Sequence, residues 1–177
     1  MPNTLDRQFA ATRADEKWVG DITHVATGEG WVYLAAVEDL YSRRIVGRAM
    51  GPSPDSALTA RALAMAVARR RPGPGLLVHS DRGCQYTSAE YRRAAAGHGA
   101  ALSFSRKGNC RDNAPMESFF ASLKKELVHH EDYATRDEGR ASIFGYIEAF
   151  YNRVRRHSSR GYVAPAEFER MHNQTHR

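Results

Sequence analysis

Three acidic residues stand at positions where an acidic side chain needs a reason. Asp21 interrupts the apolar and aromatic stretch WVGDITHV, which has the composition of a strand, an element that Asp disfavours. Asp81 directly follows the short apolar run LLVHS, and Glu117 lies near the start of an amphipathic helical pattern. Singly, an exposed strand edge, a turn before Gly83 and compensation of a helix dipole would explain these three acids. Held together without His or Cys, three carboxylates would instead form a hard oxygen site suited to Mg²⁺ or Mn²⁺.

The elements that must position these acids can be read from the pattern of apolar residues. Asp55 or Ser56 and then Ser88 are expected to cap two helices, and Asn113 to cap a third that carries Glu117. Three strands followed by helix, strand, helix and strand indicate an α/β fold, a mixed sheet covered by helices. The expected strands are 18–25, 31–37, 44–50, 76–79 and 101–105, and the expected helices are 56–71, 88–96, 116–127, 143–154 and one that opens at Pro165.

Length and composition restrict the class of protein. The 177 residues favour one domain, and 26 Lys and Arg against 20 Asp and Glu give a net charge of +6, which favours a polyanionic partner such as nucleic acid. Cys84 and Cys110 form no CxxC pair, so neither a disulfide framework nor a cysteine zinc site is expected. The first twenty residues are charged, and no stretch reaches the roughly 18 apolar residues of a membrane helix. A cytoplasmic protein is expected.

The segments around the three acids carry a family resemblance. WVGDITH, VHSDRGCQYTS and SFSRKGNCRDNAPMESFFASLKKEL resemble the integrase core of bacterial insertion-sequence transposases, the DDE class related to retroviral integrases. The resemblance extends from about Arg7 to Phe168 and includes EDLYSRRIVG, YIEAFYNRVRRHSSRGY and PAEF. It departs from the family at Arg111, where many relatives carry an aromatic residue, and at Cys84, where many carry Ser.

The resemblance implies a ribonuclease-H-like fold, a five-stranded mixed sheet flanked by helices, with a C-terminal helical extension. It puts Asp21 on the first strand, Asp81 just past the fourth and Glu117 on the helix after the fifth, as catalytic residues and metal ligands. Two Mg²⁺ or Mn²⁺ ions are implied, with Asp21 bridging them and the other two acids binding one ion each. Ions about 3.5 to 4 Å apart could activate a water or a 3′-hydroxyl and stabilise the leaving oxygen of a phosphodiester.

Basic residues near these acids are candidates for DNA contacts. Lys124 lies two helical turns, about 10 Å, after Glu117 on the same helix face, where the family pattern has a basic residue. The basic loop before that helix fits a strand-positioning loop, and the arginine-rich tail could follow phosphates. A solvated lysine, loop and helix end are the structural alternatives. The candidate DNA-binding residues are Lys124, Arg106, Lys107, Arg111, Arg155 and Arg156.

The function that the resemblance implies is polynucleotidyl transfer: cleavage at transposon ends followed by attack of the freed 3′-hydroxyl on another phosphodiester. A hydrolytic nuclease of the same fold is the alternative among enzymes, because only the entering nucleophile differs. A non-catalytic DNA-binding remnant of a mobile element is the alternative from another class.

The expected partners are transposon-end and target DNA and a second copy of the chain in the active complex. Twenty residues before Asp21 leave no room for an end-reading helix-turn-helix domain, which is expected upstream or on a separate chain. The chain is expected to divide into an N-terminal arm (1–17), a catalytic core (18–130) and a helical extension with a basic segment (131–177). It is expected in the bacterial cytoplasm, associated with the nucleoid when bound to DNA.

Overall fold

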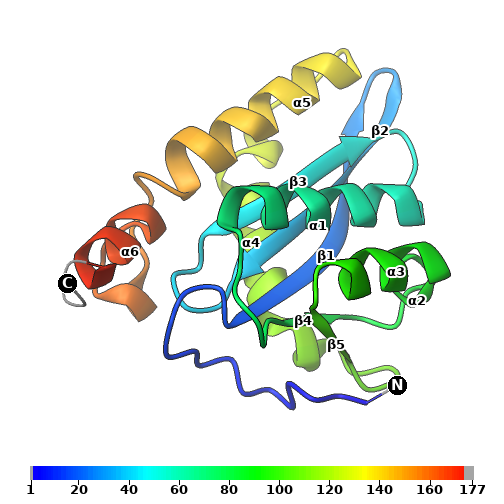
Figure 1. Cartoon of the computed structure of the whole chain (residues 1–177). Coiled ribbons are helices and arrows are strands. Elements are labelled where there is room, and N and C mark those ends of the chain that lie inside the picture. Colours follow the sequence, from blue (N-terminus) through cyan, green and yellow to red (C-terminus); the bar gives the residue numbers. More distant parts are fainter. Residues whose placement is uncertain (1, 174–177) are drawn as a thin grey trace.

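A five-stranded mixed sheet forms the centre of the structure, a computed structural model that describes residues 2–173 (Figure 1). Its strands are β1 (Lys17–Thr27), β2 (Gly30–Asp39), β3 (Ile45–Gly51), β4 (Leu77–Ser80) and β5 (Ala101–Phe104). They lie in the order β3-β2-β1-β4-β5, with antiparallel pairing from β3 to β1 and parallel pairing from β1 to β5. The five-stranded mixed sheet expected from the sequence is therefore confirmed.

Helices cover both faces of this sheet, as Figure 1 shows. They are α1 (Ser56–Arg70), α2 (Cys84–Thr87), α3 (Ala89–Gly97), α4 (Ala114–Glu126), α5 (Arg136–Gly145) and α6 (Pro165–Asn173). Side chains alternate along a strand, so on β1 Trp18 enters one apolar core while Val19 and Val25 enter the other. Helix α1 packs on β2, β3 and α3, and helices α4 and α5 both contact β1. A sheet buried on both faces explains why its strands are so apolar.

The ends of the helices match the sequence in part. Asp55 accepts a hydrogen bond from the Leu58 amide at the start of α1, and Ser88 caps α3, as expected. The expected cap at Asn113 is wrong: the Asn113 side chain makes no capping bond, and its Nδ2 instead donates to the carbonyl of Gly20 on β1, at 3.3 Å. A long-range contact thus replaces a local one. The short helix α2 was not expected.

The expected helix 143–154 changes type beyond α5 and ends at Tyr151. After Gly145 the chain forms a wider π-helical turn over residues 146–151, and the Asn152 amide bonds to the carbonyl five residues back. The Asn152 side chain explains the change, because its Oδ1 accepts from the Ile45 amide (2.8 Å) and its Nδ2 donates to the Ile45 carbonyl (3.0 Å). Helical spacing alone cannot indicate this contact with β3.

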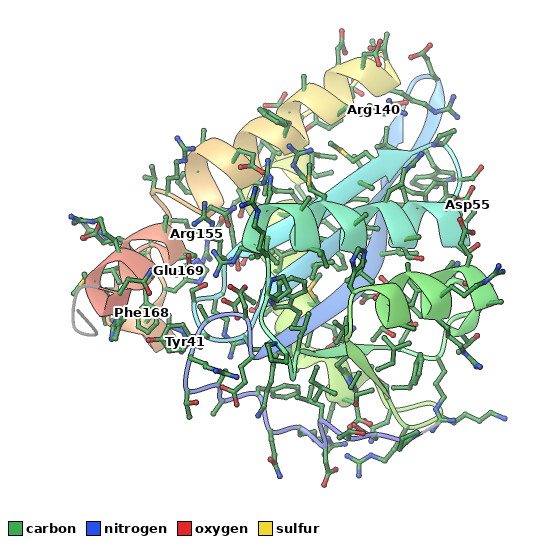
Figure 2. All side chains as sticks on the ribbon, viewed as in Figure 1. Tyr41, Asp55, Arg140, Arg155, Phe168 and Glu169 are labelled. Carbon is green, nitrogen blue, oxygen red and sulfur yellow. The ribbon has the colours of Figure 1, made fainter. Side chains whose placement is uncertain are left out.

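One partly buried arginine joins four parts of the chain. Arg70, at the end of α1, donates to Asp15 at 2.8 Å, to both carboxylate oxygens of Glu169 at 2.8 and 2.9 Å, and to Asp39 at 3.4 Å. Asp39 is fully buried at the end of β2, and Glu169 belongs to α6. Figure 2 shows Glu169 on the side of α6 that faces the sheet. This cluster attaches α6 to the sheet.

The closest approach of a helix to the sheet is at Gly47 on β3. A Cβ atom there would overlap the Ala62 carbonyl oxygen of α1 and lie 2.7 Å from the Ala66 Cβ. We expect Gly47→Ala to lower the free energy of unfolding by about 1–3 kcal/mol, measured by urea denaturation, because α1 must move away from β3. Gly145→Ala is the control: a Cβ there meets nothing within 4 Å, so a gain of about 0.5–1 kcal/mol is expected in helical backbone. Equal effects of the two substitutions would contradict this packing.

No helix in residues 2–173 combines the length and the apolar character needed to cross a lipid bilayer.

Candidate active site

Asp21 and Asp81 are brought together by the parallel pairing of β1 and β4. Val19 on β1 lies opposite His79 on β4, and continuing this register by two residues puts Asp21 beside Asp81, just past the end of β4. Both acids line one polar pocket of about 230 Å³. The Asp81 carboxylate accepts from the Gly83 amide at 2.7 Å, which fixes it in the turn after the strand.

Glu117 approaches the same place from the first turn of α4. The bond from Asn113 to the carbonyl of Gly20 attaches the start of α4 to β1, one residue before Asp21. Pro115, which lacks an amide hydrogen, follows at the beginning of the helix, where none is needed. Glu117 is exposed there, and its charge acts on Asp21.

The electrostatics of Asp21 indicate an excess of negative charge. Burial raises the pKa of Asp21 from 3.8 to about 7, and the carboxylates of Asp81 and Glu117 add to this effect, against a hydrogen bond from the Ile22 amide. In the part of the chain that the structure describes, no Lys, Arg or His forms an ion pair with any of the three acids. Such a set of oxygen donors fits a hard divalent cation.

The three carboxylates do not already form a finished metal site. Among residues 2–173, no group of three or more His, Cys, Asp or Glu side chains lies close enough together to hold a metal ion. Asp21 and Asp81 share a pocket whose other polar lining groups include His24 and Gln85. His79, by contrast, is buried and bonded to Ser103 and so lies outside the pocket.

The loop before α4 is organised by Asp112, a residue that the sequence reasoning missed. Asp112 is fully buried and accepts from the amide, Nε and Nη2 of Arg106, from Arg7 Nε and from Asn3 Nδ2. Hydrogen bonds from the Arg106 side chain, and then from Arg7, hold the pKa of Asp112 well below its usual range. The only sequence signal was an acid inside a basic loop. Asp112 fixes both this loop and the N-terminal segment ahead of the helix that carries Glu117.

The basic residues of this loop lie beside Asp81. A groove of about 420 Å³ is lined by Asp81 together with Arg106 and Lys107. The Arg106 side chain is about half exposed although it bonds to Asp112, and Lys107 is exposed. Arg111 is exposed in the 3₁₀ turn that follows. The structure therefore gathers two of the candidate DNA-binding residues, Arg106 and Lys107, beside one acid of the site.

The remaining candidate cations differ in how free they are. Lys124 is half-buried two turns after Glu117 on α4, and Arg156 is exposed. Arg155, labelled in Figure 2, is occupied within the chain: it pairs with Glu126 at 2.8 Å and bonds to Ser122. Its place at the end of the π-helical turn was not evident from the sequence.

Known proteins share both the sequence and the fold. The integrase core domain family matches residues 11–110, and a second integrase core domain pattern matches residues 117–172. The insertion element IS600 uncharacterized 31 kDa protein of Shigella sonnei is 49% identical over 173 residues, 98% of this chain and 64% of that protein. The transposase InsF for insertion sequence IS3A of Escherichia coli (strain K12) is 47% identical over 167 residues, 94% of this chain and 58% of that protein. The chain thus spans about three fifths of the length of these relatives.

Solved structures with little sequence identity share the architecture. The catalytic core domain of BIV integrase has a TM-score of 0.67 at 17% identity, covering 91% of this chain and 97% of that chain. A chain of the simian T-cell lymphotropic virus intasome in complex with PP2A regulatory subunit B56 gamma has a TM-score of 0.75 at 16% identity, covering 90% of this chain and 55% of that chain. The expected ribonuclease-H-like fold is confirmed, and the chain belongs to the integrase core domain family.

Proposed function

We propose that this chain is the catalytic core of a DNA transposase, which cleaves DNA at the ends of a mobile element and joins the freed 3′-hydroxyl to a target strand. The observation that carries the proposal is the Asp21 carboxyl, whose pKa is raised to about 7 by burial and by Asp81 and Glu117. An acid whose pKa is raised by burial and by neighbouring acids, and which lines a polar pocket, is typical of a functional site. The similarity to InsF, named a transposase, supports the same conclusion.

Asp21, Asp81 and Glu117 would hold Mg²⁺ or Mn²⁺, with two ions in the active complex. Bound there, divalent ions would supply activation of the attacking hydroxyl or water and stabilisation of the leaving oxygen. The chain's own part is to present three ionised carboxylates, with Asp21 losing its proton as the charge is neutralised. The HTLV-2 integrase catalytic core, described in complex with magnesium in a dimeric form, supports this choice of ion.

The DNA would follow the basic side of the site. Arg106, Lys107 and Arg111 would contact phosphates beside Asp81, and Lys124 and Arg156 would do so along and beyond α4. Arg155 would also contact a phosphate, and it would keep its ion pair with Glu126. A net charge of +6 favours such contacts without regard to sequence.

The proposal includes an organisation and partners. We assign an N-terminal arm to residues 1–17, the catalytic core to 18–130 and the helical extension to 131–177. A second copy of the chain and an end-reading helix-turn-helix domain, upstream or on a separate chain, would complete the active complex. The terms intasome and dimeric form, used for two structurally similar integrases, support assembly. The site of action would be the bacterial cytoplasm, at the nucleoid.

The test is a strand-joining assay. The chain, fused to an end-binding domain, is given a labelled 3′-hydroxyl DNA end, target DNA and Mg²⁺. Joined products are expected, and Asp81→Asn and Glu117→Gln chains with native-like melting curves should yield none. Hydrolysis without joining in the unchanged chain would favour a nuclease, and joining by the Asp81→Asn chain at the unchanged rate would contradict the metal site.

Lys124 provides a separate prediction about DNA. We expect Lys124→Ala to weaken DNA crosslinking several-fold and to lower the slope of log affinity against log salt concentration by about 0.9, the value for one lost phosphate contact. Metal binding should not change, because a cation cannot bind the ion. Lys125→Ala, one position along α4 and exposed, is the matched control and should change crosslinking less. Lost metal affinity with unchanged crosslinking would show that Lys124 has another role.

A further inference from the structure

A second cavity, of about 370 Å³, lies at the N-terminal end of α4 and shares no lining residue with the pocket of Asp21 and Asp81. Ser118 of α4, Arg43 of the β2–β3 turn and the hydroxyl-bearing Ser158 and Ser159 line it. Glu38, near the end of β2, lines it as well. The segments that meet here are far apart in the chain, and none of these residues is assigned a role in the proposed metal site.

Two buried polar atoms at this cavity lack a partner. Glu38 is 1% exposed; its Oε1 accepts from Arg43 Nη1 at 3.3 Å, but its Oε2 has no hydrogen-bond partner. His157 is 9% exposed, and its Nε2 is likewise unpartnered. Buried polar atoms are nearly always paired, so two exceptions lining one cavity indicate a polar ligand.

The charges around the cavity indicate that this ligand is an anion. Burial, together with the positive charges of Arg155, Arg43 and Arg160, lowers the pKa of His157 to about 4. Burial raises the pKa of Glu38 to about 8, against the charge of Arg43, and this favours the neutral form of the carboxyl, which can donate a proton. The positive end of the α4 dipole, at Ala114 and Pro115, also faces the cavity and favours a bound anion. Arg43, the N-terminus of α4 and several hydroxyl donors line the cavity and suit a phosphate group better than a metal ion.

We propose that this cavity binds a phosphate of the DNA backbone next to the phosphodiester that reacts at the three acids. The assignment of this phosphate to DNA rests on the proposed function. On β2, Ala36 pairs with Asp21, and Glu38 lies two residues further, about 7 Å along the strand. On α4, Ser118 directly follows Glu117. Arg43 supplies the charge, and the hydroxyls of Ser118, Ser158 and Ser159 donate hydrogen bonds.

The experiment has two arms, both without divalent metal so that no strand is cut. In the first, inorganic phosphate is titrated against the full chain, and NMR follows the amides of Ser118, Ser158 and Ser159. In the second, affinity is measured for duplexes in which one phosphate at a time is replaced by an uncharged methylphosphonate. The proposal predicts phosphate-dependent shifts at these amides and a roughly tenfold loss of affinity at one position adjacent to the joining site.

Substitutions in the cavity test whether the sensitive DNA phosphate binds there. Arg43→Gln should bind unmodified DNA roughly tenfold more weakly, should lose no further affinity at that position, and should show a salt slope lower by about 0.9. Arg61→Gln, an exposed arginine on α1 with the same change of charge, is the control and should keep the position effect. Because Arg43 pairs with buried Glu38, a chain with Ser158→Ala and Ser159→Ala is a second variant that removes only exposed hydroxyls. In this double variant, the difference in affinity between unmodified DNA and DNA with the methylphosphonate at that position should be smaller than in the unchanged chain.

The outcomes separate the inference from the proposed function. A chain that joins strands but shows no position effect, or one whose position effect persists in Arg43→Gln, would overturn the cavity assignment alone. Shifts with inorganic phosphate in a chain that binds no DNA would overturn the DNA source and the proposed function together. A position effect abolished by Arg43→Gln supports the site whether or not the chain joins strands.

Discussion

Replacing Asp21 by Asn should reduce strand joining to background and, in the metal-free chain, raise the stability at pH 8. Asparagine has nearly the size of aspartate but cannot offset the charge of a divalent ion, so joining is lost. Without metal, the wild-type carboxylate lies partly buried and feels the charges of two other acids, and removing its own charge removes that cost. Loss of activity with a gain in stability is typical of a charge retained for function.

The pH dependence of this gain has a definite sign. The pKa of Asp21 is about 7 in the folded chain against an ordinary value of 3.8, so the folded state binds the proton more tightly than the unfolded state. Stability from this group is therefore present below pH 4 and lost as pH rises toward 7. The full difference corresponds to roughly 4 kcal/mol, and solvent screening reduces it to about 1–3 kcal/mol.

Urea denaturation of both chains in EDTA measures this effect. The Asp21→Asn chain should exceed the wild type at pH 8 and approach it at pH 4. Asp132→Asn, the same chemical change at an exposed position, is the control and should show no such pH-dependent gain. A stability difference between the Asp21→Asn chain and the wild type that is the same at both pH values would show that Asp21 is not destabilised by its surroundings.

Arg70→Met should be among the most destabilising single substitutions in the chain. Methionine fills much of the same volume but leaves the carboxylates of Asp39 and Glu169 without the guanidinium that binds them. Removing one partner from a buried charge cluster costs about 3–5 kcal/mol, and urea denaturation at pH 7 measures it. The neighbouring Arg69→Met is the control: its side chain is 43% exposed and pairs with Glu148, so a loss below about 1 kcal/mol is expected. Similar losses for the two variants would contradict the role of Arg70.

The sequence predicted what depends on local pattern. Apolar, β-branched and aromatic stretches indicated all five strands. Asp55 and Ser88 indicated helix starts, because a cap bonds within its own first turn. The role of Asn113 was predicted wrongly, and that of Asn152 was not predicted, because their partners, Gly20 and Ile45, lie 93 and 107 residues away. Such bonds leave no local signal.

The candidate site was predictable to a similar degree. Sequence context singled out Asp21, Asp81 and Glu117 individually. Only the family resemblance assigned them to one site, and their roles remain a prediction. The hub at Asp112 was missed because three of its five hydrogen bonds come from the nearby Arg106 and the others from Asn3 and Arg7. Asn3 and Arg7 lie 109 and 105 residues from Asp112, and contacts over such a separation leave no local signal.

The cluster around Arg70 also bears on the order in which the chain folds. The bond from Arg70 to Glu169 closes a loop of 99 residues, so its entropic cost delays it until much of the intervening sheet has formed. During synthesis, Asp15, Asp39 and Arg70 leave the ribosome well before Glu169. In the nascent chain, Asp15 and Asp39 are therefore present with the Arg70 guanidinium before its partner Glu169 has been synthesised. Helix α6, which is translated after the whole sheet, completes a contact that Asp15 and Asp39 share.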